Sequence, residues 1–267
     1  MKSAPLLAIL TAVLVISSII TIIPAEAKQE GKRVLAFSEK EANDAVAKGC
    51  KIVREVKNIT ALVCNPLVSD ALGLQEDIEM FAVDSGANTQ IGATTVWSTN
   101  TGANTRIAIL DTGYNYNHSQ LSDSYDGGYD FVNNDIYPLD DNGHGTHVAG
   151  LITSNGNSPY ANSKGVAPAA KIISGKVLGA NGSGSFSDIL AAIYWAADYS
   201  QKVDAISMSL GSSKTFKTTC DSYYPAMKDA IDYAIGKGIV VVIAAGNSGN
   251  AGVSFPGCVS TALTVGA

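Results

Sequence analysis

Residues 106–267 alternate between short apolar runs and longer stretches with helical periodicity. Each apolar run is rich in β-branched residues and long enough for one buried strand. Continuous apolar strands that alternate with helices are typical of a parallel sheet covered on both faces. We therefore predict a doubly wound α/β domain. Its strands are expected within 106–110, 171–178, 203–207, 239–244 and 261–265, and its helices within 187–199 and 224–235.

Residues 32–83 follow a different pattern, in which four short strands flank two helices. A capping box from Ser38 to Glu41 opens the first helix. The order βαββαβ is the split arrangement of a ferredoxin-like α+β domain. About 50 residues is marginal for independent folding, so we expect this domain to rely on a disulfide or a partner surface. The strands are predicted at 34–37, 52–56, 59–63 and 78–81, and the second helix within 68–74.

The first 27 residues differ from both regions. Lys2 is followed by an almost wholly apolar stretch from 6 to 23, and then by the small-residue pattern Ala25-Glu26-Ala27. These features predict a secretory signal peptide, which is cleaved from the mature chain. A membrane anchor is the alternative, because the apolar stretch is close to spanning length. No other segment of the sequence is apolar and long enough to cross a membrane.

Polar and glycine-rich residues between 84 and 104 indicate a linker that is easily cut. We therefore divide the chain into a signal peptide at 1–27, a small α+β domain at 28–84, a linker at 85–105 and an α/β domain at 106–267. An accessory domain that stays attached is the other interpretation of the 28–84 region.

The composition adds few constraints. The chain has 267 residues, 46% of them hydrophobic and only 16% charged, which fits a packed globular protein and not a disordered one. A formal net charge of −6 offers no basic surface for nucleic acid.

Four cysteines suggest two disulfides in an exported chain. Three pairings are possible, and four buried thiols are a further alternative. If 52–56 and 59–63 pair as a hairpin, Cys50 and Cys64 come nearly opposite each other. This argument favours Cys50–Cys64, which leaves Cys220–Cys258.

Three segments carry residues suited to catalysis. Asp111 follows a buried strand, His144 lies in the run Asn142-Gly-His-Gly-Thr-His147, and Asn247 stands on a glycine-rich turn after another strand. A carboxylate can orient a histidine that acts as general base, and an amide can donate to a developing oxyanion. Singly, each is also compatible with a structural role. A zinc site formed by His144, His147 and Asp111 is a second possibility.

Together, these three segments resemble the subtilisin family. The chain order aspartate, histidine, asparagine is the family's order, and the histidine run is highly specific. The resemblance covers about 33–267. It implies that Asp111 orients His144, that His144 takes a proton from a serine, and that Asn247 stabilises the oxyanion. Supporting matches lie at 165–168, 176–179, 181–184, 207–211 and 265–267.

The resemblance also implies how a polypeptide substrate binds. The segments Gly182-Ser183-Gly184 and Ser209-Leu210-Gly211 resemble the two edges that hold an extended peptide by strand addition. The leading domain resembles the family's inhibitory propeptide, which would act as an intramolecular inhibitor, with its tail in the same groove. Primary cleavage is then expected within Asp84 to Gln90. We expect a monomer that binds no nucleic acid and no membrane after signal cleavage.

Two family features differ in this sequence. The nucleophile belongs to a G-T-S-M-A segment, which is absent here. We expect it beyond residue 267 and the chain as printed to be inactive. Gln120 replaces an aspartate of a family calcium site, whereas Asp130 and Asp135 lie in a segment that resembles another calcium loop.

The sequence therefore predicts the precursor of a secreted serine endopeptidase that needs no cofactor for its chemistry. Structural calcium is possible at Asp130 and Asp135. A secreted peptide-binding protein without catalysis and a zinc hydrolase are the alternatives.

Overall fold

The computed structural model describes residues 31–82, 93–157 and 164–266. Residues Gly31–Ala267 form one compact unit. The predicted signal peptide and the predicted cleavage window at 84–90 lie outside the described residues. No helix in the described ranges is long and apolar enough to cross a membrane.

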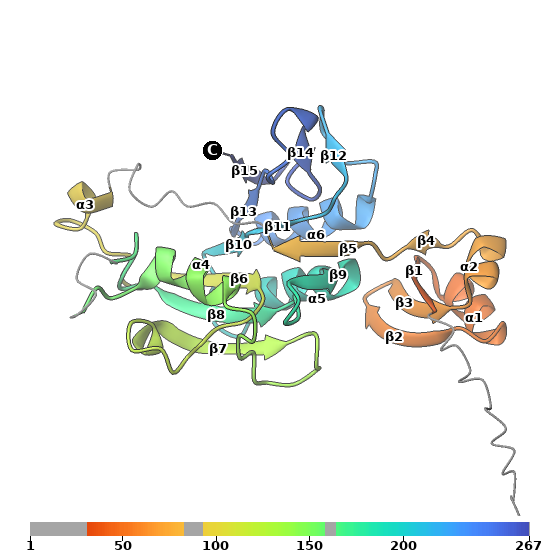
Figure 1. The fold of residues 1–267 in the computed structure, drawn as a ribbon, viewed down its shortest axis with the longest axis horizontal. Coiled ribbons are helices and arrows are strands. Elements are labelled where there is room, and N and C mark those ends of the chain that lie inside the picture. The colour runs from red at the N-terminus through yellow and green to blue at the C-terminus, as the bar shows by residue number, and fades with distance from the viewer. Residues whose placement is uncertain (1–30, 83–92, 158–163, 267) are drawn as a thin grey trace, which may run out of the picture. The chain divides into compact units, whose positions relative to one another are not determined.

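The α/β domain is built on a six-stranded parallel sheet (Figure 1). The strand order is β15-β13-β10-β6-β8-β7, and every neighbouring pair runs parallel. This confirms the predicted doubly wound sheet. The edge strand β7 was not predicted, because its Gly127-Gly128 pair interrupts any apolar run. The strands are β6 (Arg106–Asp111), β7 (Tyr125–Asp130), β8 (Lys171–Lys176), β10 (Ala205–Met208), β13 (Val240–Ala244) and β15 (Leu263–Val265).

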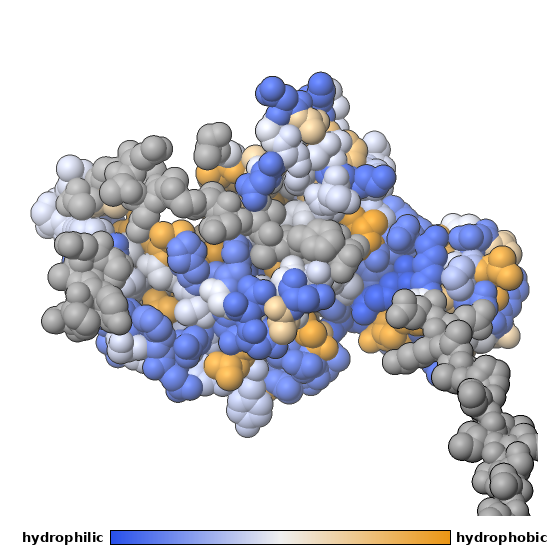
Figure 2. Space-filling model, viewed as in Figure 1, coloured by the Kyte–Doolittle hydropathy of each residue, from blue (hydrophilic) through white to orange (hydrophobic). Residues whose placement is uncertain are grey.

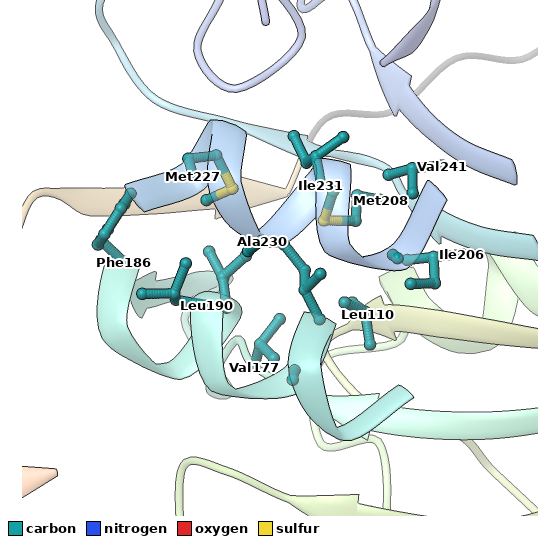
Figure 3. Packing of buried hydrophobic residues seen from close by; sticks show 14 of the residues in the cluster. Leu110, Val177, Phe186, Leu190, Ile206, Met208, Met227, Ala230, Ile231 and Val241 are labelled. Carbon is teal, nitrogen blue, oxygen red and sulfur yellow. The ribbon is translucent and has the colours of Figure 1, made fainter. Parts of the chain in front are cut away.

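The side chains of β6 show why the sheet is buried on both faces. Ala108 and Leu110 join one apolar cluster with α5 (Phe186–Ala197) and α6 (Pro225–Gly236). Ile107 and Ile109 face the other cluster with α4 (His144–Thr153). Successive side chains of a strand point to opposite faces, so an all-apolar strand needs helices on both sides. Figure 3 shows α5, α6 and the strands contributing side chains to the first cluster.

The leading domain is a four-stranded antiparallel sheet with two helices. Its order, β2-β3-β1-β4, is the ferredoxin-like order that the sequence predicts. Ser38 caps α1 by accepting from the Glu41 amide, and Gly73 ends α2 in a left-handed conformation. The elements are β1 (Lys32–Ala36), α1 (Glu39–Ala47), β2 (Lys51–Val56), β3 (Ile59–Cys64), α2 (Pro66–Leu72) and β4 (Gln75–Glu76).

The strand predicted at 78–81 is present, shifted by one residue, but its assignment to the leading sheet is wrong. Gln75–Glu76, and not 78–81, completes the leading sheet. Strand β5 (Glu79–Ala82) instead lies between β9 (Ser183–Ser185) and β11 (Leu210–Gly211) of the α/β domain. Asp77 separates the two strands, and its buried side chain bonds to Ser187 of α5, which commits the chain to the α/β domain.

Both favoured disulfides are present, with Cα atoms 4.4 Å apart for Cys50–Cys64 and 5.4 Å apart for Cys220–Cys258. The second bridge ties the polar 212–223 segment to the residues after β14. In the same region, β12 (Thr215–Phe216) pairs with β14 (Val253–Ser254).

The expected linker at 85–105 contains a short helix, α3 (Ala93–Val96). Trp97 then anchors the segment, because its indole N–H donates to the Val166 carbonyl at 3.0 Å. Short 3₁₀ helices lie at Ser122–Ser124 and Gly249–Ala251. On the face shown in Figure 2, hydrophobic residues form small separate groups among hydrophilic ones.

Candidate active site

Asp111 ends β6 in the middle of the parallel sheet. Its side chain is 1% exposed, and Oδ1 accepts a hydrogen bond from the Thr112 amide at 2.7 Å. Its backbone carbonyl accepts from Val177 and Leu178, which follow the neighbouring strand β8. The sheet therefore fixes this carboxylate through both its main chain and its side chain.

His144 is the first residue of α4, and its ring lies against Asp111. The distance from His144 Nδ1 to Asp111 Oδ1 is 2.8 Å, and the imidazole side chain is 12% exposed. A carboxylate that accepts from Nδ1–H holds the ring in the tautomer whose Nε2 can take a proton. The structure thus brings together the two residues predicted to form a catalytic pair.

The start of α4 is fixed by hydrogen bonds that sequence reasoning missed. Asp140 accepts from the amides of Asn142, Gly143 and Thr146 and from the hydroxyls of Thr112 and Thr146. Burial alone would raise the pKa of Asp140, but these donors outweigh burial and lower it. Asp140 stays ionised and holds the helix entrance in place. An aspartate just before a glycine-rich helix start was the available signal.

Gly145 lets α4 approach the loop after β6. A Cβ at this position would lie 2.2 Å from the Gly113 carbonyl oxygen, so no larger residue fits. The Gly145 amide also donates to Thr112 Oγ1 at 2.8 Å. Gly145 therefore allows the close approach of His144 to the end of β6, whereas Gly143 has open space beside it and a φ of +107°.

Lys176 is a second supporting residue that the sequence analysis did not single out. Its ammonium group is buried, and it donates to the carbonyls of Thr112 and Leu178 and to the Asp141 carboxylate, at distances of 2.5–3.0 Å. These bonds connect the ends of β6 and β8 with the segment before α4. A lysine at the end of an apolar strand was the signal that could have identified it.

Asn247 follows β13, at the same edge of the sheet as Asp111, because parallel strands end at one edge. Gly246 has a φ of +89°, and a Cβ there would meet Ser254 Oγ at 2.2 Å. The turn that presents Asn247 thus depends on glycine. The Asn247 side chain is exposed, and no other described residue is hydrogen-bonded to it.

The two predicted peptide-binding segments flank an extended strand. β5 pairs antiparallel with β9, where Met80 lies opposite Gly184 and Phe81 opposite Ser183. It also pairs antiparallel with β11, where Ala82 lies opposite Leu210. Figure 1 shows β5 beside both strands. The remaining predicted binding residues, Gly182 and Ser209, immediately precede β9 and β11, and Gly211 pairs with Phe81.

The zinc alternative receives no geometric support. Within the described residues, no group of three His, Cys, Asp or Glu side chains is placed to hold a metal ion, including Asp111, His144 and His147. The zinc interpretation needs that convergence.

Asp130 accepts hydrogen bonds on both carboxylate oxygens from residues 132–133, and Asp135 Oδ1 accepts from the Tyr137 amide. A carboxylate oxygen can accept such a bond and still ligate a cation, so calcium at Asp130 and Asp135 stays a prediction.

An α/β sheet with this aspartate–histidine pair at its carboxyl edge matches the subtilisin-like architecture. The family model described as "Subtilase family" matches residues 102–267. The chain therefore belongs to the subtilase family.

The similar proteins agree with this assignment. The chain is 42% identical over 161 residues to a thermophilic serine proteinase from Bacillus sp. (strain AK1). That alignment covers 60% of this chain and 37% of the proteinase. The chain is also 40% identical over 176 residues to thermitase from Thermoactinomyces vulgaris, covering 66% and 59%.

A crystal structure of a cold-adapted subtilisin-like serine proteinase aligns with a TM-score of 0.54 and 35% identity, covering 63% of this chain and 56% of that one. The chain thus spans between about two fifths and three fifths of the length of the two curated relatives.

Proposed function

We propose that this chain is part of the precursor of a secreted serine endopeptidase, in which Asp111 and His144 are two members of the catalytic triad. The observation that carries the proposal is the 2.8 Å contact between His144 Nδ1 and Asp111 Oδ1 at the carboxyl edge of the sheet. Membership of the subtilase family supports the same chemistry. The third member is a serine, which we expect beyond residue 267.

In the proposed reaction, the serine hydroxyl attacks the carbonyl carbon of a substrate peptide bond. Its proton passes to His144 Nε2, and the Asp111 carboxylate stabilises the imidazolium that forms. The Asn247 amide donates to the oxyanion of the tetrahedral intermediate. His144 then gives the proton to the leaving amine, and water releases the acyl group by the same route.

The substrate backbone is proposed to bind where β5 lies. Two strands that both pair with one extended segment offer main-chain hydrogen bonds to a peptide of any sequence. While β5 occupies this position, a substrate is excluded. We therefore propose that the leading domain is an intramolecular inhibitory propeptide.

The test introduces Asp111→Asn into a longer protein, expressed from the gene together with its downstream coding sequence. Asparagine keeps the size of the side chain but favours the wrong histidine tautomer, so we expect kcat to fall about 10⁴-fold, the drop that the same change causes in another serine protease. Casein hydrolysis and labelling by a serine-directed phosphonate measure the effect. Asp123→Asn, which changes an exposed carboxylate outside the proposed triad, is the matched control.

Activity that survives a zinc chelator and disappears with the phosphonate supports the serine mechanism. An extended chain that binds peptides but neither cleaves them nor reacts with the phosphonate would show a binding protein instead. Equal activity in Asp111→Asn and the control would refute the assigned role of Asp111.

A further inference from the structure

Lys57 lies at the tip of the β2–β3 hairpin in a backbone conformation that lysine seldom adopts. Lys57 and Asn58 alone connect Val56 to Ile59, which face each other across the hairpin. The φ of Lys57 is +54°. Two-residue hairpin turns need positive φ, for which glycine and asparagine are preferred. The backbone conformation therefore does not favour lysine at this position. A role for Lys57 is expected from its side chain instead.

The ammonium group of Lys57 lies against two tyrosine rings of the α/β domain. Nζ is 3.9 Å from the ring centroid of Tyr194 on α5 and 3.6 Å from that of Tyr233 on α6. The two rings are 5.3 Å apart and inclined by 61°, so they form an open wedge. Both distances are well within the range of about 6 Å over which a ring attracts a cation.

Acidic groups strengthen this wedge. The Tyr233 hydroxyl donates to Asp198 Oδ1 at 2.7 Å, which fixes the ring independently of Lys57. A hydrogen bond from Lys237 is the main cause that lowers the pKa of Asp198, and the charge of Lys57 adds to it. Burial raises the pKa of Tyr194, and the nearby Asp229 raises it further. The wedge thus joins two aromatic faces to the nearby Asp198 and Asp229. Lys237, which bonds to Asp198, lies farther from the wedge than Lys57 does, with Nζ 4.8 Å from the Tyr233 ring centroid.

We infer that Tyr194 and Tyr233 form a recognition site for a lysine side chain, and that Lys57 of the leading domain occupies it. The site lies seven residues after Ser187 on α5, which is about 10 Å along the helix from the amide that Asp77 caps. Two anchors at separate points of one helix fix the orientation of the leading domain. The site does not depend on peptidase activity, because both rings are held by the α/β domain itself.

Lys57→Gly separates side-chain recognition from a requirement of the turn. Glycine fits positive φ better than lysine, so a residue present only for the turn would be improved by this change. Amides near the hairpin tip would then exchange hydrogen more slowly. If instead the ammonium group is what matters, its loss should make these amides exchange about tenfold faster in the full chain. Tyr194→Leu and Tyr233→Leu should also speed the exchange.

Lys57→Met and Lys51→Met form a matched pair on the same hairpin, since Lys51 is exposed and outside the wedge. We expect faster exchange only in Lys57→Met. Added n-butylammonium should restore protection in Lys57→Gly and shift the ring resonances of Tyr194 and Tyr233, whereas n-butanol should do neither. Unchanged or slower exchange in Lys57→Gly, or equal restoration by n-butanol, would overturn the assignment of a cation site.

Discussion

The two large sheets of this molecule differ in what covers their faces. The parallel sheet of the α/β domain is covered on one face by α4 and on the other by α5 and α6. The leading sheet has its own helices on one face only, where Val34 and Leu62 pack with α1 and α2. Its other face, which includes Leu35 and Ala61, belongs to the large apolar cluster of the α/β domain.

This difference indicates that the α/β domain completes the core of the leading domain. The contact also contains ion pairs with buried carboxylates. Arg54 Nε lies 2.5 Å from Asp188 Oδ1, and Arg33, which is partly exposed, has its Nε 2.9 Å from Asp77 Oδ2. A buried ion pair contributes little net stability but is costly to break. The interface therefore combines apolar burial with ion pairs that are costly to break.

The largest expected effect comes from a matched pair of leucine truncations. Leu110→Ala removes methyl groups from the centre of the parallel sheet and should lower the free energy of unfolding by about 2–5 kcal/mol. Leu35 is equally buried but lies at the interface between the domains. Leu35→Ala should therefore increase local opening of the leading sheet and change the global unfolding of the α/β domain little.

Denaturant unfolding and residue-resolved hydrogen exchange measure the two effects separately. If Leu35→Ala lowered the unfolding midpoint of the α/β domain as much as Leu110→Ala does, the two domains would share one cooperative core. The proposed division between them would then be wrong.

A smaller effect is expected from breaking the ion pair at the interface. Arg54→Met leaves Asp188 buried with Arg33 at 3.8 Å. It should favour opening of the leading domain by about 2 kcal/mol, the low end of the usual cost, because Arg33 remains nearby. In Arg54→Met/Asp188→Leu neither member of this ion pair remains, so most of this loss should be recovered. Hydrogen exchange in β2 and β3 measures both. A double variant as open as the single one would contradict a desolvation cost at Asp188.

The sequence predicts the α/β domain well because its signals are local and repeated. Strands such as β6 and β13 are continuous apolar runs, and their helices have clear periodicity. The strand pattern alone could not divide residues 75–82 between two sheets, because both short strands fit it and only tertiary contacts separate them. The family resemblance, and not the pattern, placed the tail of the leading domain beside β9 and β11. The decisive contact, Asp77 with Ser187, joins residues 110 positions apart.

The candidate active site shows the same limit. Asp111 and His144 could be predicted, because a strand-end carboxylate and a glycine-flanked histidine run are visible in the sequence. Asp140 and Lys176, which hold these residues in place, act through bonds to several loops. Their residue types suit many surface roles, and only the three-dimensional arrangement reveals that they converge on one site.

The smallest expected effect concerns pH and arises from Asp77. Burial raises the pKa of this carboxyl above its ordinary 3.8, despite the opposing charge of Arg33 and hydrogen bonds from Ser187. The docked state therefore binds a proton more readily than the open state does. This contribution to docking is fully present below pH 3.8, and it is lost as the pH rises through the raised pKa.

Asp77→Asn should remove this contribution. The charges that face Asp77 are the guanidinium of Arg33 and the carboxylate of Asp188, which lies 3.8 Å from that arginine. Hydrogen exchange of the leading sheet, corrected for the intrinsic effect of pH, measures the opening equilibrium between about pH 4 and 7. We expect docking of the unmodified chain to weaken as pH rises, and a flatter profile in Asp77→Asn. Asp70→Asn, at an exposed ion pair with Lys32, should keep the original profile. If docking strengthened as the pH rose, the charge of Arg33 would outweigh burial at Asp77. The ionised form of Asp77 would then favour docking at neutral pH.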